Sequence, residues 1–294
     1  MRWRFEPRVR ALLQGAVDMH VHSAPDVLPR ILDDLELARQ AQAAGMRAIC
    51  IKNHFESTAS RATLAGDETG FPVYGGIALN HTVGGLNPHA VEFALRMGAR
   101  VVWLPTLHAA RFLQHRDHVR SMQALPGEGK PGISLLDAGG QLDPAVPAIL
   151  DLVAAHDAVL ATGHVGIDEA RAVVREAARR GVRRIVVTHP LASFVGYTAA
   201  QTAEMLDLGA TWIEHVYNDT TRIVSHPISV AALAEGIKAV GAAHCIMSTD
   251  SGQALSPVPV QQMAIYIQDM LALGLTEAEV RIMVADNPAR ALGL

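Results

Sequence analysis

Short apolar runs alternate with segments of helical periodicity along almost the whole chain, and this alternation restricts the fold more than any other feature. Several runs are continuously hydrophobic, which is typical of strands covered on both faces. The segments between them are rich in Ala, Leu, Glu and Arg, and several end at a glycine that can cap a helix. The runs predict strands at residues 16–22, 47–54, 72–80, 100–108, 158–164, 184–190, 211–217 and 244–250.

Eight strands that alternate with helices over about 250 residues are typical of a (β/α)8 TIM barrel. We therefore expect residues 1–294 to form a single barrel domain. An open doubly wound sheet is the alternative, but it usually carries a Gly-rich phosphate-binding turn after its first strand, and none follows residues 16–22. Residues 121–143 lengthen the connection between strands four and five, and their PGEGKPG and DAGG motifs predict an inserted surface excursion.

The composition favours a globular protein that acts on a small molecule. Half of the residues are hydrophobic, 18% are charged, and the net charge of −4 comes from mixed signs, so we expect neither nucleic acid nor a membrane as a partner. No apolar run is long enough for a signal peptide or a transmembrane helix. Cys50 and Cys245 lie in apolar runs, as reduced core cysteines do. These features indicate a cytoplasmic protein and are compatible with a homo-oligomer.

Histidines gather near the carboxyl ends of the expected strands, and the last of these strands ends at an aspartate. The residues are His20, His22, His54, His81, His108, His164, His189, His215 and Asp250. In a parallel barrel the carboxyl ends of the strands surround one mouth, where the active sites of such barrels are built. The sequence therefore predicts a histidine-rich site at this mouth.

The spacing of these residues indicates a metal site. His20 and His22 alternate on the first strand, so both imidazoles lie on one face and can share a metal ion. His164, His189 and Asp250 end three other strands and can complete the ligand set. Imidazole and carboxylate ligands favour zinc, although manganese, iron and cobalt fit the same set. Asp250 is expected both to bind the metal and to accept a proton from the attacking water.

Lysine is rare in this chain, because only three of the 25 Lys and Arg residues are lysines. One of them, Lys52, follows the buried-looking run 48–51. A buried lysine tends to lose its proton. A neutral amine can add carbon dioxide, and the resulting carbamate is an anionic oxygen ligand that can bridge two metal ions. Lys52 is therefore a candidate metal ligand, with an outward-pointing lysine as the alternative.

Further polar residues at or after the strand ends are candidates for contact with the substrate. Glu214 and His215 are adjacent on strand seven, so only one of them can face the mouth. The regions around Arg61, Asn80 and Arg111 favour an anionic or carboxylate substrate, although ordinary loop positions explain Arg61 and Asn80 equally well. The candidates are His54, Arg61, Asn80, His108 and Glu214.

Taken together, these residues resemble the amidohydrolase superfamily of metal-dependent hydrolases, and the similarity covers almost the whole chain. The matching residues are Asp18–His22, His164, His189, Asp250 and the ending Asn287–Gly293. The resemblance implies that His20, His22 and Asp250 hold a buried metal ion. It implies that His164 and His189 hold a second, more exposed ion. With one ion only, His164 would join its shell, and His189 would be a catalytic residue that contacts the substrate or the oxyanion. Asp250 would pass its proton on to the leaving group.

One position departs from the phosphotriesterase-like members of this superfamily, which carry a carbamylated lysine or a glutamate at the end of strand four. Residues 104–108 (LPTLH) contain neither. Lys52 on strand two is expected to take this role from the other side of the mouth. Within the superfamily, the chain is similar to an uncharacterised bacterial branch.

The resulting hypothesis is a metal-dependent hydrolase that cleaves an amide, ester, lactone or phosphoester bond of a small substrate. A mononuclear, nonhydrolytic decarboxylase on the same scaffold is the alternative. A histidinol-phosphatase-like barrel is disfavoured, because that family ends its ligand set with Asp-x-His, whereas Ser251-Gly252 follows Asp250 here. The nonenzymatic alternative is a barrel that binds a ligand or partner and keeps a residual metal site.

Overall fold

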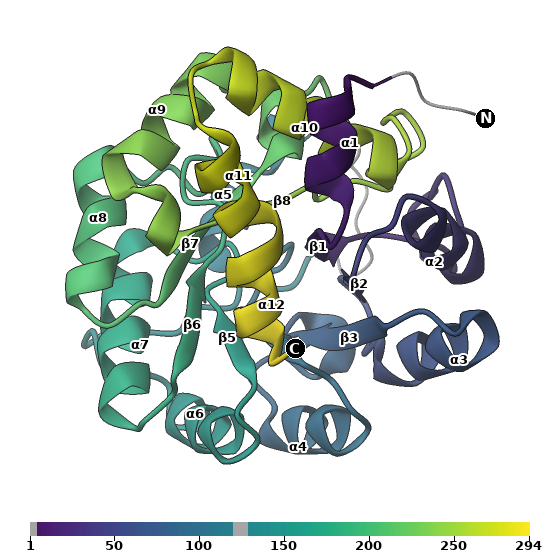
Figure 1. Cartoon of the computed structure of the whole chain (residues 1–294). Helices are drawn as coiled ribbons and strands as arrows, with labels where there is room; N and C mark the ends of the chain where they lie inside the picture. The colour runs from purple at the N-terminus through teal and green to yellow at the C-terminus, as the bar shows by residue number, and fades with distance from the viewer. Residues whose placement is uncertain (1–4, 120–128) are drawn as a thin grey trace.

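Eight parallel strands follow one another around the centre of the molecule in chain order (Figure 1). They are β1 (Val17–Val21), β2 (Ala48–Ile51), β3 (Val73–Ala78), β4 (Val101–Trp103), β5 (Val159–Ala161), β6 (Arg184–Val187), β7 (Trp212–Val216) and β8 (Cys245–Ser248). The ring closes at the rim of β8 and β1, where the Asp250 amide donates to the His20 carbonyl (2.8 Å) and the His22 amide to the Ser251 carbonyl (2.8 Å). This computed structural model describes residues 5–119 and 129–294, and it confirms the predicted (β/α)8 TIM barrel.

Helices lie on the outside of the strands and cover them from solvent (Figure 1). Those between strands include α2 (Asp34–Ala43), α3 (Ala59–Thr69), α4 (Pro88–Arg96), α6 (Ala145–Ala155), α7 (Ile167–Arg179), α8 (Ala199–Asp207) and α9 (Val230–Val240). After β8 come α10 (Pro259–Ala272), α11 (Glu277–Arg281), the π-helical segment Ile282–Asp286 and α12 (Asn287–Leu292). An additional helix, α1 (Pro7–Leu13), precedes β1 and buries Val9, Leu12 and Leu13 in the same apolar cluster as α10.

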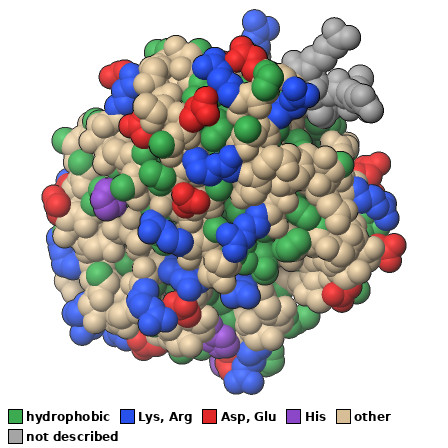
Figure 2. All heavy atoms as spheres, viewed as in Figure 1, with side chains coloured by type: hydrophobic (Ala, Val, Ile, Leu, Met, Phe, Trp, Pro, Cys, Tyr) green, Lys and Arg blue, Asp and Glu red, His purple; other side chains and the backbone are tan. Residues whose placement is uncertain are grey.

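Helix α12 closes the amino-terminal end of the barrel, which faces the viewer in Figure 1. Its Ala291 and Leu292 pack against Val17 and Met19 of β1 inside the barrel. The Asn287 side-chain amide, at the start of this helix, donates to the Cys245 carbonyl at 2.7 Å. The surface of this end carries basic side chains interspersed with acidic ones (Figure 2). The opposite end, where the strands finish, is left to form the mouth.

The strands end earlier than the sequence predicts. For example, β4 ends at Trp103 rather than at residue 108, and β5 ends at Ala161 rather than at residue 164. The chain leaves the extended conformation at the rim, where His189 and Asp250 have left-handed backbone angles of φ 21° and 51°. Residues other than glycine rarely adopt such angles, and those that do cluster at functional sites. Most of the histidine-rich set therefore lies on the rim loops just beyond the strands.

The connection between β4 and β5 contains the short helix α5 (Ala110–Gln114) and then the predicted excursion. Residues 121–128 of this excursion, and residue 120 before it, lie outside the described part of the chain. In the remainder, Leu136 forms an isolated antiparallel bridge with Leu142, and the Asp137 amide donates to the Gln141 carbonyl at 2.8 Å. The chain therefore reverses direction in a small hairpin-like turn before α6.

Two expectations from the composition can be compared with the structure. Cys50 in β2 and Cys245 in β8 are both buried and form no disulfide. Among the helices of residues 5–119 and 129–294, none is long and apolar enough to cross a membrane.

Candidate metal centre

His20, His22 and Asp250 converge at the mouth of the barrel, although 228 residues separate His22 from Asp250 in the chain. His20 lies in β1, His22 directly follows it, and Asp250 lies two residues after β8. Asp250 Oδ1 is 3.1 Å from His20 Nε2 and 3.0 Å from His22 Nε2. One ligand atom from each of the three residues lies within 4.8 Å of the others, so a single metal ion can bind all three.

The electrostatics of this trio fit a cation. Glu214 Oε2 accepts a hydrogen bond from His20 Nδ1 at 3.1 Å, which leaves the lone pair of a neutral His20 on Nε2, facing the Asp250 carboxylate. Two electron-rich atoms at this distance require a positive charge between them. Burial and the Lys52 ammonium lower the pKa of His20, but Glu214 and Asp250 outweigh them and raise it to about 9. The two carboxylates therefore favour positive charge at this point, and a divalent cation can supply it.

Asp250 is held in place by a tight approach of its loop to β1. Gly252 has a φ of 126°, and a Cβ at this position would lie 2.0 Å from the His22 carbonyl oxygen, so only glycine fits there. The Asp18 carboxylate, buried under the site, accepts hydrogen bonds from the Thr249 amide (3.1 Å) and hydroxyl (2.5 Å). The conformation of the Ser-Thr-Asp-Ser-Gly segment is therefore fixed from both sides.

His164 and His189 form a second pair of imidazoles at the same mouth. Their Nε2 atoms are 3.2 Å apart, and the ring centroids of His189 and His20 are 5.8 Å apart. His189 Nδ1 lies 3.3 Å from Asp219 Oδ1, a carboxylate that can fix its tautomer. His164 Nδ1 is buried and has no hydrogen-bond partner within the described chain. Two imidazole nitrogens that converge in this way are suited to share a metal ion.

Lys52 points into the mouth rather than outward. It follows β2, which ends at Ile51, and its side chain is buried. Lys52 Nζ lies 2.9 Å from His20 Nε2. Burial lowers the pKa of Lys52 to about 8, although Asp250 and Glu214 oppose this shift. The amine is therefore beside the metal-ligand trio and loses its proton more easily than an exposed lysine.

The structure distinguishes between the two adjacent residues of β7. Glu214 faces the mouth, where it holds His20. His215 faces outward beneath α9, where a Cβ on Gly236 would lie 3.5 Å from its ring. Neither ring nitrogen of His215 has a partner among the residues that the structure describes. Burial lowers the pKa of His215 to about 4, so it is a neutral core histidine.

We expect His215→Leu to stabilise the protein most at acidic pH. Because the pKa is about 4 when folded and about 6.5 when unfolded, the unfolded state binds more protons as pH falls below 6.5, which costs about 2 kcal/mol at pH 5. The variant removes this cost. Urea unfolding at pH 5 and pH 8 measures it, with His244→Leu at an exposed position as the control. An equal change of unfolding free energy at both pH values would contradict the prediction.

The remaining substrate-contact candidates have different surroundings. His54 stacks on His22, with ring centroids 4.9 Å apart, and lines a cavity beside the trio. Asn80 uses its amide on the His54 carbonyl and the Thr106 hydroxyl, and its oxygen accepts from the Thr106 and His108 amides. Asn80 therefore braces the rim rather than facing the cavity. His108 is buried beside it, with its Nδ1 3.3 Å from the His81 amide.

Arg61 is fully engaged away from the cavity. Its guanidinium donates to both carboxylate oxygens of Asp34 at 2.7 and 2.8 Å, to Glu56 at 2.6 Å and to the Ser23 carbonyl at 2.9 Å. These bonds join the loop after β1 to helices α2 and α3. Instead, the arginine beside the metal-ligand trio is Arg30, which the sequence patterns do not single out.

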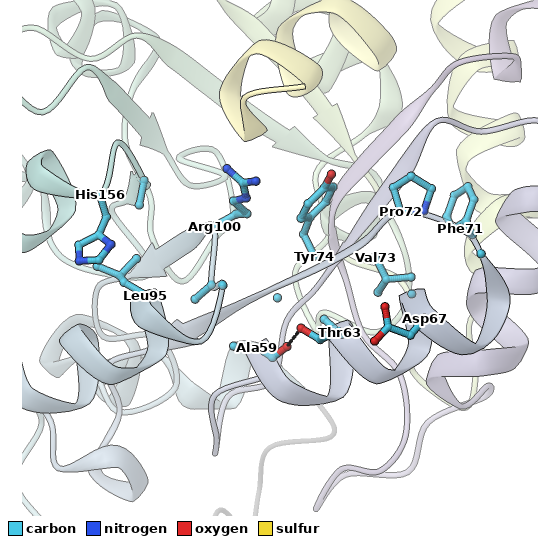
Figure 3. Close-up of a pocket in the computed structure, with 17 residues that line it drawn as sticks. Ala59, Thr63, Asp67, Phe71, Pro72, Val73, Tyr74, Leu95, Arg100 and His156 are labelled. Carbon is cyan, nitrogen blue, oxygen red and sulfur yellow. Dashed lines mark hydrogen bonds between the residues drawn. The ribbon is translucent and has the colours of Figure 1, made fainter.

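A cavity of about 40 Å³ lies beside the metal-ligand residues, of which His164 and Asp250 line it. Its lining includes Arg30, His54, His164, Asp219, Asp250 and Gln253 together with apolar side chains. A larger hollow of about 760 Å³ lies at the opposite end of the barrel, between α3 and α4 (Figure 3). Tyr74 at the start of β3 and Arg100 just before β4 line it. We assign the candidate site to the smaller cavity, because the metal-ligand residues converge there and because the active sites of barrels lie at the carboxyl ends of the strands.

The fold and this mouth define a (β/α)8 barrel with a histidine-rich candidate metal centre at the carboxyl ends of its strands, and solved structures share the fold. An amidohydrolase from Pseudomonas aeruginosa matches with a TM-score of 0.59 and 12% identity over 97% of this chain and 98% of that one. A probable 2-pyrone-4,6-dicarboxylic acid hydrolase from Acinetobacter baumannii, with citric acid bound, matches with a TM-score of 0.61 and 12% identity. This match covers 96% of this chain and 100% of that one. An organophosphorus hydrolase from Deinococcus radiodurans matches with a TM-score of 0.60 and 16% identity over 96% of this chain and 94% of that one.

The chain belongs to the family described as a family of unknown function (DUF6282), whose model matches residues 15–214. The matched segment contains His20, His22, Lys52, His164 and His189 and ends at Glu214, before Asp250. Comparison with curated proteins finds no match.

Proposed function

We propose that this protein is a metal-dependent hydrolase that cleaves an amide, ester, lactone or phosphoester bond of a small substrate. The observation that carries this proposal is the convergence of His20, His22 and Asp250 on one point, with His164 and His189 beside them. Structural neighbours described as an organophosphorus hydrolase and as a probable 2-pyrone-4,6-dicarboxylic acid hydrolase support the general class. Zinc is the metal we propose, because imidazole and carboxylate ligands suit it.

A divalent cation at this site would supply a Lewis acid and lower the pKa of a water molecule. The chain's own residues supply the proton transfers. Burial alone would raise the pKa of Asp250, but the charges and hydrogen bonds of His20 and His22 hold it well below its usual range. Asp250 is therefore ionised at neutral pH and can accept the proton of the attacking water. It can then return that proton to the leaving group, as general acid–base catalysis requires.

Two carboxylates orient the imidazoles of the site. Glu214 holds His20 through its Nδ1, and Asp219 does the same for His189. Such carboxylate–histidine pairs fix the tautomer that leaves Nε2 free for a metal and raise its basicity. Asp219 was not identified from the sequence, where it is one aspartate in the loop after β7. Its position in the Tyr-Asn-Asp-Thr segment carries no recognisable spacing signal.

The number of metal ions and the product of the reaction together separate the hydrolase from a mononuclear decarboxylase on the same scaffold. Metal analysis of protein purified without added chelator or metal, followed by assays on ester, lactone, amide and phosphoester substrates, tests the proposal. We expect stoichiometric metal and hydrolysis that a chelator abolishes and added zinc restores. A protein that binds no divalent metal would overturn the proposal, and one ion with carbon dioxide release from a carboxylic acid would favour the decarboxylase.

Glu214→Gln is expected to weaken metal affinity by about 10- to 100-fold, the usual loss when a carboxylate that orients a metal ligand is neutralised. The amide still accepts the hydrogen bond from His20, so the fold is retained while the charge is lost. Competition with a zinc-binding dye measures the affinity. Glu235→Gln, at an exposed position on α9, is the control. Unchanged affinity in Glu214→Gln would show that this carboxylate does not act on the metal site.

A further inference from the structure

We propose that Arg30 binds a carboxylate group of the substrate and places it beside the reacting bond, while an apolar wall holds the rest of the molecule. This inference rests on the proposed hydrolase function and adds a substrate class to it: small, largely apolar carboxylic acids. Four observations support it: the burial of Arg30, its fixed position, its free donors and the lining of the cavity.

Arg30 is a buried arginine on the cavity wall. Its side chain is 1% exposed, and it forms an ion pair of 2.7 Å between its Nε and Asp26 Oδ2, whose side chain is fully buried. Its Nη2 lies 3.2 Å from His22 Nδ1. The guanidinium therefore contacts one ring nitrogen of His22 while Asp250 contacts the other. An anion bound by Arg30 would lie one imidazole ring away from the metal-ligand atoms.

The loop after β8 holds Arg30 in position. Arg30 forms an isolated antiparallel bridge with Gln253, and the Ile31 amide donates to the Gly252 carbonyl at 3.0 Å. The loop that carries Arg30 is thus bonded to the loop that carries Asp250. A recognition group held in this way loses little conformational entropy when the ligand binds.

Arg30 also retains hydrogen-bonding capacity, in contrast to Arg61. A guanidinium has five N–H donors in a planar fork that matches a carboxylate. Only Nε and Nη2 of Arg30 have hydrogen-bond partners within residues 5–119 and 129–294, and Nη1 has none there. The donors of Arg61, by contrast, are directed to Asp34, Glu56 and two carbonyl groups. Of the two arginines near the mouth, Arg30 is the one with donors to offer.

The cavity lining explains the rest of the substrate class. In the described part of the chain, Arg30 is the sole Lys or Arg that lines the cavity. The acidic residues of the lining, Asp219 and Asp250, are already paired with histidines. One cation favours a single monoanionic carboxylate over a phosphate dianion. The other walls are largely apolar and are formed by Leu107, Phe112, Val119, Phe194, Ile223 and Val224.

The test compares the binding of acetate, its neutral amide acetamide and methylphosphonate by calorimetry, because the cavity of about 40 Å³ limits the size of the probe. In the protein as purified and after removal of metal, we expect the carboxylate to bind about 10- to 100-fold more tightly than the amide. Arg30→Gln should abolish this preference, and Arg30→Lys should restore part of it, because the charge returns without the fork. Arg222→Gln, an exposed arginine on the loop after β7, is the control and should keep the preference.

The outcomes separate this inference from the proposed function. Equal binding of acid and amide, a preference that survives in Arg30→Gln after removal of metal, or tighter binding of the phosphonate after removal of metal would overturn the assignment of Arg30 even if the protein hydrolyses neutral substrates. A preference that is present only with metal and survives in Arg30→Gln would place the carboxylate on the cation instead. Conversely, if the protein binds no metal but prefers the carboxylate to the amide through Arg30, the carboxylate site would be supported and the proposed hydrolase function would be overturned. Circular dichroism confirms that each variant is folded.

Discussion

Asp250→Asn is expected to reduce turnover by about 10²- to 10⁴-fold, the usual contribution of a general base, while most of the metal stays bound. The carboxylate accepts a proton in the proposed reaction, and an amide cannot. Asparagine nevertheless keeps an oxygen toward His20 and His22 and tolerates the left-handed backbone angle found at this position. The loss should therefore appear in kcat rather than in folding or metal content.

Steady-state assays and metal analysis on the same preparation of Asp250→Asn test this expectation. Asp168→Asn, on the exposed first turn of α7, provides a matched control that should be fully active. If the variant retained full activity with metal bound, Asp250 would not be the base. If it lost all metal, Asp250 would act mainly as a ligand.

Lys52→Met is expected to remove one of two metal ions and to lower activity by about 100-fold or more, as the loss of one member of a two-metal site would do. The amine lies 2.9 Å from His20 Nε2, and burial lowers its pKa to about 8. Since only the neutral amine adds carbon dioxide, the carbamate should form more completely as pH rises toward and above 8. Metal content and activity of the parent protein should then increase with bicarbonate at pH 8.

Metal analysis of Lys52→Met with and without bicarbonate measures the effect. Lys238→Met, a partly exposed lysine on α9, is the control and should respond to bicarbonate as the parent does. A single ion per chain in both parent and Lys52→Met would indicate a mononuclear site. In that case Lys52 would act as a charged group beside His20, and the decarboxylase alternative would gain support.

Whether a polar side chain near the mouth is free to contact a substrate depends on which of its hydrogen-bond donors and acceptors are already bonded within the folded chain. Arg30 and Arg61 are the same residue type, one on the loop after β1 and the other in the first turn of α3. The carboxylates of Asp34 and Glu56 engage Arg61, whereas Asp26 engages Arg30 through one donor and leaves others free. Similarly, the hydrogen bonds of Asn80 are taken by the backbone around His54 and His108. No spacing in the sequence encodes these pairings, because they join loops brought together only by the barrel.

The sequence by itself determined the barrel and the composition of its mouth. Alternating apolar runs and helical segments can bury their surfaces in few ways, and parallel strands bring all their carboxyl ends to one rim. The place of the histidines in the chain therefore anticipated that they would meet. The tertiary structure alone decided that Glu214 rather than His215 faces inward, that Lys52 points into the mouth and that Arg30 rather than Arg61 lines the cavity. These choices depend on where each strand ends and how the loops pair across the rim, which are long-range properties of the packed chain.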